Sequence, residues 1–575
     1  MQGNLTAVVM TKAEESPADR ETLDLRVQQG GRRARYSLMR TSNILLASVL
    51  VIVGVVATRG ITKGEFSYNV DETQHAVTGL YAADLLRDHP FRHPVQYTYR
   101  YYAQYPALSG VIHWPPLFYG VEGVCFLAFG PRVEAARVSV LLFALLGFIF
   151  WFRLMNYLLN EWAASLTTLL LGLLPAVLLF EKTVMLEVPS LALCIAATYF
   201  WVRFLLDEDH RCLGWFAGFA TAALMTKQNS VYLLLFCALS ILFLRKYRLL
   251  ATRRVIFLAA LACLIIVPFY VAVYMIHWRT ISMDLSEPSV SISKRLLFYL
   301  KALPDQLGWT LLALAVLGIA TSRSWSRRPG ASALMLAWIV SCYVTFTIIG
   351  HKEARYVLCW IPPFLYFAGG ILTNERLWPA GRIWKVAASG FLALTTLLSA
   401  WGFERPRVEG YAPAARWVTG AAKQGVILYD ADLPGNFIFF VRVNDPGRRF
   451  AVLRKALYAY RIKSQGGSEM LIHRREDLQN LIQGYGVRFV LLASNRHLVF
   501  ADQYWLSELV QTPQFRLAAT FPISTIDGNV SHSDLLCYEN VDWQHATDKS
   551  LRVRMLTLDH DIVVPFSELL GDGPK

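Results

Sequence analysis

The sequence predicts a polytopic α-helical membrane protein of about 11–13 transmembrane helices that ends in an α/β extracytoplasmic domain. Hydrophobic residues make up 55% of the 575 residues and charged residues only 17%, against about 25% in soluble domains. The apolar runs are roughly 15–24 residues long, close to the roughly 20 residues that span a bilayer. Composition and run length together therefore favour a membrane protein over a chain of soluble domains.

The chain is basic, with a net charge of +14 when histidine is neutral. Such a charge can indicate a nucleic-acid partner, but here the basic residues stand in short loops beside apolar runs. Lysine and arginine in short loops mark the cytoplasmic side of a membrane protein. The charge therefore indicates topology, and no nucleic-acid partner is expected. Two such groups are Arg245, Lys246, Arg248, Arg253 and Arg254, and Arg323, Arg327 and Arg328.

The eight cysteines do not form a disulfide framework, because most of them lie inside apolar runs. Cys537 is the single cysteine of the polar C-terminal part and has no partner there. No CxxC pair and no HExxH helix offers a metal site. A metal requirement is left open by the sequence.

Residues 1–40 are polar, carry charges of both signs and are expected to form a disordered cytoplasmic tail. The apolar run 43–58 has no A-x-A cleavage site after it, which indicates an uncleaved anchor. Residues 60–114 then form a long polar loop on the outer side. Val77, Leu80, Tyr81 and Leu85 have helical spacing in this loop, which predicts amphipathic helices in the membrane interface.

Eleven further apolar runs follow the first. The topology that the basic loops indicate places both Trp114 and Glu181 on the outer side, so the chain must cross the membrane an even number of times between them. Three apolar runs lie there, which is an odd number, unless 115–130 does not cross fully or 162–180 is broken near Pro175. Thirteen transmembrane helices are therefore expected, with eleven as the alternative. The runs lie near 115–130, 135–157, 162–180, 183–206, 213–226, 229–244, 255–277, 306–322, 332–350, 356–372 and 384–402.

Residues 403–575 differ in pattern from the membrane part, which itself spans 41–402. Short apolar stretches alternate here with helical ones, and 477–486 followed by 487–493 is typical of a helix that returns into a buried strand. We therefore expect a soluble α/β domain of about 170 residues outside the membrane.

Asp71 and Glu72 follow the first membrane helix in the long outer loop. Acids favour the first turn of a helix, so this pair can be a helix cap. A carboxylate there can also act as a general base that removes a proton from an attacking hydroxyl. The two roles do not exclude each other.

His113, Trp114, Pro115 and Pro116 open the next apolar run. Proline at the start of a helix can be ordinary punctuation; the functional alternative is that Trp114, Pro115 and Pro116 support a site. Glu187 lies inside an apolar run, where an ionisable group is costly and a functional role is the default hypothesis. Its alternative is an interfacial acid near a helix end.

The count of membrane crossings places four further residues on the outer side, namely Lys227, Lys352, Arg355 and Tyr356. Lysine and arginine are usually more frequent on the cytoplasmic side. Cations concentrated there indicate an anionic ligand, since arginine and lysine both bind phosphate. The alternatives are anionic lipid headgroups and local salt bridges. The convergence of acids and cations on one face is stronger evidence for a functional site than any single motif.

In order and spacing, residues 40–400 resemble the C superfamily of glycosyltransferases (GT-C), in the branch of protein O-mannosyltransferases and the lipid A aminoarabinose transferase. Bacterial relatives usually carry Lys before Pro-Pro, and the later acid of the family is more often Asp, whereas this chain has His113-Trp114 and Glu187. The matching residues are Asp71-Glu72, Pro115-Pro116-Leu117, Glu187, Thr226-Lys227, Arg355-Tyr356 and Pro362-Pro363.

The resemblance implies an inverting transfer from a polyprenyl-phosphate sugar at the outer face, with Asp71 as base and Glu72 beside it. Lys227, Lys352, Arg355 and His113 would then bind the donor phosphate. It also implies a bacterial inner membrane as the location and leaves a divalent metal possible. The acceptor (protein, lipid or glycan) stays open.

Two other classes of function remain as alternatives. A transporter or lipid flippase would show internal repeats and charges near the bilayer midplane, and the sequence shows neither. A non-catalytic scaffold whose outer domain binds a partner would leave the converging charges unexplained. The transferase is therefore the favoured hypothesis.

Overall fold

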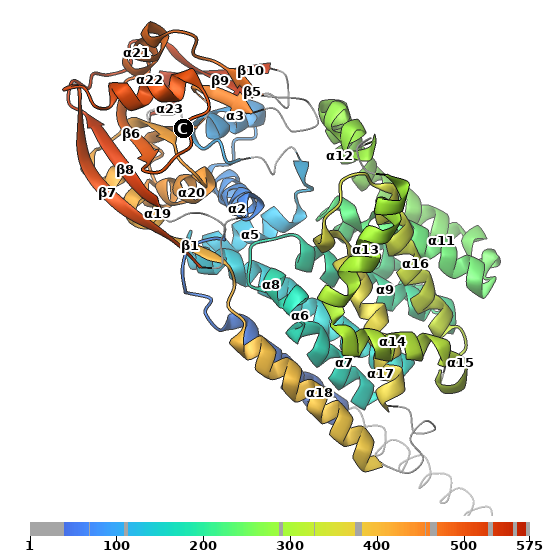
Figure 1. Ribbon diagram of the computed structural model, residues 1–575. Helices are drawn as coiled ribbons and strands as arrows, with labels where there is room; N and C mark the ends of the chain where they lie inside the picture. The colour runs from blue at the N-terminus through green and yellow to red at the C-terminus, as the bar shows by residue number, and fades with distance from the viewer. Residues whose placement is uncertain are drawn as a thin grey trace, which may run out of the picture.

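The computed structural model describes residues 40–570, except for 68, 109–112, 287–290, 327, 374–381, 455, 461–467, 527–532 and 556–559. The tail expected at 1–40 thus lies outside the described residues, apart from Arg40. A helical region and an α/β region lie side by side, with the α/β region at the upper left of Figure 1.

The first part of the chain is almost entirely helical. It begins with the helix Arg40–Thr58. The following elements are α2 (Val70–Asp88), α3 (Pro94–Gln104), α5 (Leu117–Phe129), α6 (Val133–Leu158), α7 (Glu161–Leu173), α8 (Pro175–Glu181), α9 (Glu187–Asp207), α10 (His210–Leu224), η1 (Gln228–Val231), α11 (Tyr232–Leu244), η2 (Tyr247–Ala251), α12 (Arg253–Ser286), α13 (Ile292–Leu307), α14 (Trp309–Ala320), α15 (Ser322–Trp325), α16 (Ala331–Ile348), η3 (Ala354–Trp360), α17 (Ile361–Thr373) and α18 (Arg382–Gly402).

Among the described residues, seven helices are long and apolar enough to cross a membrane, and nine if each of two bent pairs forms one span. The polytopic helical fold is confirmed. Two shorter apolar helices, Leu117–Phe129 and Gln228–Leu244, remain beside these. The lower expected count of eleven is reached only if both of them cross, and the count of thirteen exceeds what these helices supply.

The two segments that the parity argument singled out are both irregular. The pair α7–α8 bends by 66° just before Pro175, where the proline nitrogen has no hydrogen to continue the helix. Helix α5 has 13 residues, about 20 Å of helix at about 1.5 Å per residue, against a hydrocarbon core of about 30 Å. Apolar content alone could not distinguish these broken or short segments from full spans.

The C-terminal region contains a six-stranded sheet in the order β1-β7-β8-β6-β2-β3. Strand β2 runs parallel to β3 and β6, and the other neighbours are antiparallel. Strand β6 covers the stretch 487–493 that the sequence predicted, and α21 precedes it as expected. The strands are β1 (Arg407–Glu409), β2 (Gly425–Asp430), β3 (Phe450–Leu453), β6 (Val487–Ala493), β7 (Phe515–Ile526) and β8 (Ser533–Asn540).

Helices and two small ribbons complete this region. The ribbons pair β4 with β5 and β9 with β10. The helices are α19 (Tyr411–Ala421), α20 (Pro434–Asn444), α21 (Arg475–Gly484), α22 (Ala501–Leu509) and α23 (Phe566–Leu569), and the ribbon strands are β4 (Tyr458–Tyr460), β5 (Ser468–Met470), β9 (Ser550–Met555) and β10 (His560–Pro565).

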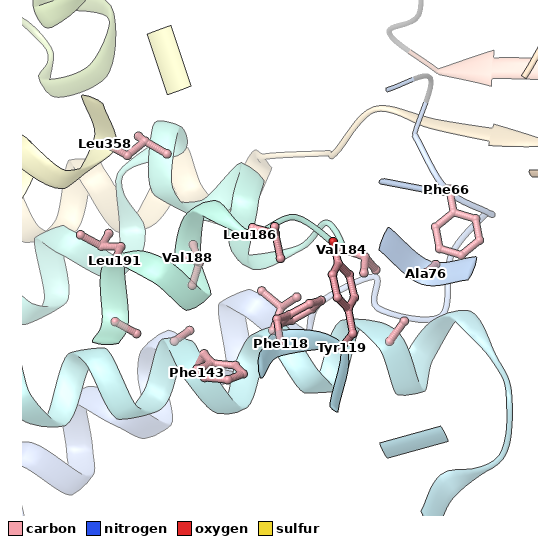
Figure 2. Close-up of a cluster of buried hydrophobic side chains, with 14 of the residues drawn as sticks. Phe66, Ala76, Phe118, Tyr119, Phe143, Val184, Leu186, Val188, Leu191 and Leu358 are labelled. Carbon is pink, nitrogen blue, oxygen red and sulfur yellow. The ribbon is translucent and has the colours of Figure 1, made fainter. Parts of the chain in front are cut away.

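The loop predicted at 60–114 folds into helices α2 and α3. Helix α2 buries Val77, Leu80 and Tyr81, as the helical spacing of these residues predicted. Its N-terminus stands on an apolar cluster from α5, α6 and α9, in which Phe118, Phe143 and Val188 meet (Figure 2). This close-packed base holds α2 and the start of α9 in fixed relation, because interiors of such density resist displacement.

Candidate active site

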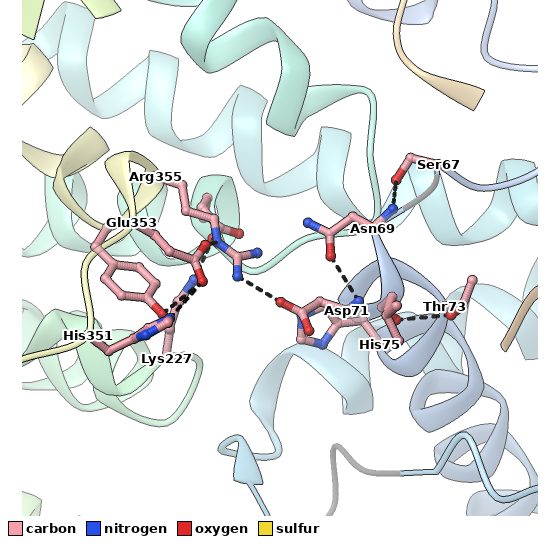
Figure 3. Close-up of polar contacts among 12 residues, drawn as sticks. Ser67, Asn69, Asp71, Thr73, His75, Lys227, His351, Glu353 and Arg355 are labelled. Carbon is pink, nitrogen blue, oxygen red and sulfur yellow. Dashed lines mark hydrogen bonds and ion pairs between the residues drawn. The ribbon is translucent and has the colours of Figure 1, made fainter. Parts of the chain in front are cut away.

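The N-terminus of α2 presents Asp71 to a cation from a distant part of the chain. The cap is Asn69, whose side chain accepts a hydrogen bond of 3.0 Å from the backbone N–H of Asp71. The Asp71 side chain is 29% exposed, and its Oδ2 lies 2.8 Å from Nη2 of Arg355. Figure 3 shows Arg355 reaching across to Asp71 from the opposite side of the site. Asp71 is thus partly exposed and at the same time ion-paired with Arg355.

Glu72 points away from this contact. Its Oε2 accepts a hydrogen bond of 2.6 Å from the backbone N–H of Ser67, and its Oε1 one of 3.0 Å from that of Val184. Neighbouring residues on a helix point about 100° apart, and here Glu72 faces Ser67 and Val184 while Asp71 faces Arg355. The geometry gives Glu72 the task of joining two loops, and its catalytic role stays a prediction.

Glu187, Lys227 and Arg355 meet next to Asp71. Glu187 is the first residue of α9, and its Oε1 lies 2.7 Å from Nζ of Lys227 and 3.5 Å from Nε of Arg355. The Glu187 side chain is 2% exposed, and burial weakens screening, so these pairs interact strongly. The structure therefore joins four residues predicted from separate motifs into one ion-pair network.

Glu353 closes the network on the far side of Arg355. Its carboxylate pairs with the Arg355 guanidinium and lies 3.1 Å from Nε2 of His351. The hydroxyl of Tyr356 donates to Glu353 over 3.4 Å, and Nζ of Lys227 lies 5.9 Å from the centre of the Tyr356 ring. Glu353 and His351 thus add to the predicted set, and Tyr356 lies where a supporting residue was expected.

Lys352 has a different environment from the one predicted. Its Nζ donates to the backbone carbonyls of Phe346 (2.6 Å) and Thr347 (2.9 Å), at the C-terminal end of α16. Burial, together with the charge of nearby Arg295, lowers the pKa of this ammonium to about 8. Lys352 therefore caps a helix end, and its phosphate-binding role stays a prediction.

The segment of His113, Trp114, Pro115 and Pro116 lies beside the network. The Trp114 ring centre is 4.4 Å from that of His75 and 5.9 Å from that of His113. Burial lowers the pKa of His113. Pro116 precedes α5, whose first residue, Leu117, donates its N–H to the carbonyl of Met225 over 2.9 Å. This bond fixes the start of α5 beside Lys227.

His75 is a residue that sequence reasoning missed. It stands four residues after Asp71, hence on the same face of α2, and its Nδ1 lies 2.7 Å from the hydroxyl of Tyr119. Burial lowers the pKa of His75 well below 6.5, and the charges of Lys227 and Arg355 lower it further. The spacing from Asp71 was the signal that could have found it.

We expect His75 to make the folded protein sensitive to acid. Since its pKa is lower in the folded state, unfolded chains bind the proton more readily and stability falls as the pH drops through about 6.5. The His75→Gln variant should lose less melting temperature between pH 7.5 and pH 5.5 than the wild type. The control is His89→Gln, an exposed histidine at the C-cap of α2. Equal losses in His75→Gln and wild type would contradict the assignment.

Within the described residues, no group of three or more His, Cys, Asp or Glu side chains is placed to hold a metal ion.

Comparison with known proteins bears on the fold. Residues 113–271 match the family model described as dolichyl-phosphate-mannose-protein mannosyltransferase, which is less than half of the chain. No curated protein sequence matches the chain significantly. ArnT from Cupriavidus metallidurans in the apo state has a TM-score of 0.58 at 14% identity, over 88% of this chain and 98% of that one. Its complex with undecaprenyl phosphate gives 0.56 at 14%, over 87% and 98%.

The chain has the fold of the GT-C membrane glycosyltransferases, with a C-terminal domain that contains strands. Within that class its likeness is to the branch of the protein O-mannosyltransferases and ArnT, which confirms the resemblance expected from the sequence. The protein is therefore an integral membrane protein of this fold. At 14% identity the structural likeness extends to the fold alone.

Proposed function

We propose that this protein transfers a sugar from a polyprenyl-phosphate sugar to an acceptor hydroxyl at the outer face of the membrane. Asp71 removes the hydroxyl proton as the oxygen attacks the anomeric carbon from the side opposite the phosphate. The bond from that carbon to the phosphate oxygen breaks, its electron pair leaves with the lipid phosphate, and the anomeric configuration inverts. A placed carboxylate is suited to this step.

The observation that carries the proposal is the network of Asp71, Arg355, Glu187 and Lys227. It places a partly exposed carboxylate 2.8 Å from a guanidinium, with an ammonium close by. Developing charge on a leaving phosphate is stabilised by cations held in advance. Lys227 and Arg355 are such cations, and the base stands within reach of the same space.

The network also implies an exchange of partners. Arg355 pairs with Asp71, and a donor phosphate would compete for the same guanidinium, since arginine binds phosphate through two parallel hydrogen bonds. Donor binding would thus free the Asp71 carboxylate as the donor phosphate takes its place at Arg355.

A groove of about 810 Å³ ends beside the network. It lies between α5, α10 and α12 and is almost wholly apolar, as a polyprenyl tail requires. Pro116 and Met225 line it, and Lys227 follows Met225 by two residues. The related fold of ArnT has been observed with undecaprenyl phosphate. We place the donor tail in this groove and its phosphate at Lys227.

Filling the groove should weaken binding of long donors. Gly214 and Gly218 line it, and a Cβ at either position would meet nothing within 4 Å. The Gly218→Leu variant should raise KM for a long-chain donor about tenfold or more, the effect of roughly two lost methylene contacts, and leave a short-chain donor unaffected. Gly390→Leu, at an equally open position on α18, is the control. A KM that rises equally for both donors would place the tail elsewhere.

By topology, the N-terminus would be cytoplasmic and the C-terminal domain extracytoplasmic, in a bacterial inner membrane. The basic loop of Arg245 and Lys246 and the network at Lys227 lie at opposite ends of α11, as this orientation requires.

The test of the function is label transfer by the purified wild-type protein. It is supplied with a panel of radiolabelled polyprenyl-phosphate sugars and with acceptor extracts of protein, lipid and glycan. Formation of a labelled product together with free polyprenyl phosphate supports the proposal. Movement of intact donor across vesicles without cleavage would contradict it and favour a flippase.

A further inference from the structure

The C-terminal domain is attached directly to α2, the helix that carries Asp71. Helix α20 lies along α2 in Figure 1. Arg442 of α20 forms a fork on Asp84, with Nη2 2.6 Å from both carboxylate oxygens and Nε 2.8 Å from Oδ2. The two side chains are 6% and 5% exposed, so an unpaired charge left there would be strongly destabilising. The C-terminal half of α2 is therefore held firmly against α20.

A closer contact lies at the other end of α2, next to Asp71. A Cβ on Gly435 of α20 would stand 2.0 Å from Oγ1 and 2.7 Å from Cβ of Thr73. Real atoms do not approach so closely, so one of the two helices would have to move. The backbone of Gly435 is not in the left-handed region, so glycine is required here for space. Thr73 follows Asp71 by two residues in the same helical turn.

The segment before α2 is attached to the same domain. The Glu65 carboxylate accepts hydrogen bonds from the backbone N–H groups of Gly410 (3.1 Å), Tyr411 (3.2 Å) and Ala412 (2.7 Å) at the N-terminus of α19. Negative charge is stabilised at a helix N-terminus. Phe66 also packs edge-on against Phe439, with ring centres 4.8 Å apart. Both the approach to α2 and its first turn thus rest on the C-terminal domain.

We infer that the C-terminal domain is a structural part of the active site and that Gly435 is a positioning residue for Asp71. The close approach of α20 to Thr73 sets the position of the first turn of α2 relative to Arg355, which comes from the membrane helices. The inference rests on the proposed role of Asp71 as base. It assigns to this domain a task in turnover, beyond any recognition of the acceptor.

The experiment compares Gly435→Ala with Gly420→Ala. Both change one helical glycine of the same domain by one methyl group, but a Cβ at Gly420 of α19 would meet nothing within 4 Å. Gly435→Ala should displace the first turn of α2 and lower kcat about 10- to 100-fold, since a misplacement of about 1 Å can cost that much. The donor KM should stay within about twofold, because Lys227 and the groove are untouched. Gly420→Ala should match the wild type.

Two further measurements separate positioning from general damage. Hydrogen–deuterium exchange of the first turn of α2 should rise in Gly435→Ala and not in Gly420→Ala, whether or not the protein proves to be a transferase. Adding Thr73→Gly to Gly435→Ala removes the clashing atoms and should restore part of kcat. If Gly435→Ala does not fold, Arg442→Lys keeps the charge but not the fork, and it should lower kcat and raise exchange in α2.

A folded Gly435→Ala protein with wild-type kcat and wild-type exchange in α2 would overturn the inference. A lowered kcat with unchanged exchange would overturn it too, because the effect would not pass through α2. A wild type without transferase activity would instead remove the proposed function. The exchange result would then still decide whether the domain holds this helix.

Discussion

Replacing Asp71 with asparagine should lower kcat by about 10²- to 10⁴-fold, the usual contribution of a general base. Asparagine keeps the size of the side chain and can still accept a hydrogen bond from Arg355, which lies 2.8 Å from the carboxylate, but it cannot take a proton. The donor KM should change little, because the groove and Lys227 remain. Turnover of wild type and variant is measured with the donor that the label-transfer panel identifies.

The control for this change is Asp534→Asn, the same substitution at an exposed position of β8, which should leave kcat unaltered. Asp71→Asn turning over as fast as the wild type would reduce Asp71 to an acid that favours the first turn of α2. Equal melting temperatures of the two variants would show that the loss belongs to chemistry and not to folding.

Replacing Lys227 with methionine should weaken donor binding by about 10- to 100-fold, since a hydrogen bond to a charged group contributes about 1.5–3 kcal/mol. Methionine preserves the length and apolar stem of the side chain. Binding of polyprenyl phosphate, with no sugar attached, is measured by titration of the purified protein. Lys301→Met, at an exposed position of α13, should bind as the wild type does.

A double variant separates phosphate binding from the loss of a buried ion pair. Lys227 lies 2.7 Å from Glu187, whose side chain is 2% exposed, so Lys227→Met alone leaves a buried carboxylate short of a partner. Adding Glu187→Gln removes that charge and should recover stability but not donor binding. Recovery of donor binding in the double variant would show that Lys227 serves only to neutralise Glu187.

The sequence grouped the residues of the network on one expected face but could not assign each member. Asp71, Glu187, Lys227 and Arg355 were grouped because one topology put them on the outer side, and the structure brings them together. Glu72 could not be separated from Asp71 by sequence, because its partners are backbone N–H groups, that of Ser67 five residues away and that of Val184 112 residues away. Such contacts leave no pattern of side chains.

Lys352 and the number of membrane helices are two further features that the sequence alone could not settle. Lys352 meets the carbonyls at the end of α16, and only the turn between two helices decides whether a loop lysine caps a helix or faces a ligand. In the membrane part, an apolar run indicates that a segment is buried in lipid or protein, but it does not give the direction in which the chain runs. The 114° bend between α13 and α14 therefore escaped a count of runs, whereas the 66° bend before Pro175 is one of the two alternatives that the count raised.

The contacts between α2 and the C-terminal domain were also beyond the sequence. Asp84 and Arg442 are separated by 358 positions, and neither belongs to a recognisable motif. By contrast, the strand at 487–493 and its preceding helix were predicted because their pattern is local. Local periodicity could be read directly, whereas pairing across the two regions depends on the assembled fold.

The most direct test of the whole account is a cryo-EM structure of the wild-type protein with bound polyprenyl phosphate. The account predicts the phosphate within hydrogen-bonding distance of Lys227 and Arg355, the tail along the groove between α5, α10 and α12, and Asp71 released from Arg355. A phosphate bound away from both cations, with the Asp71–Arg355 pair intact, would contradict it.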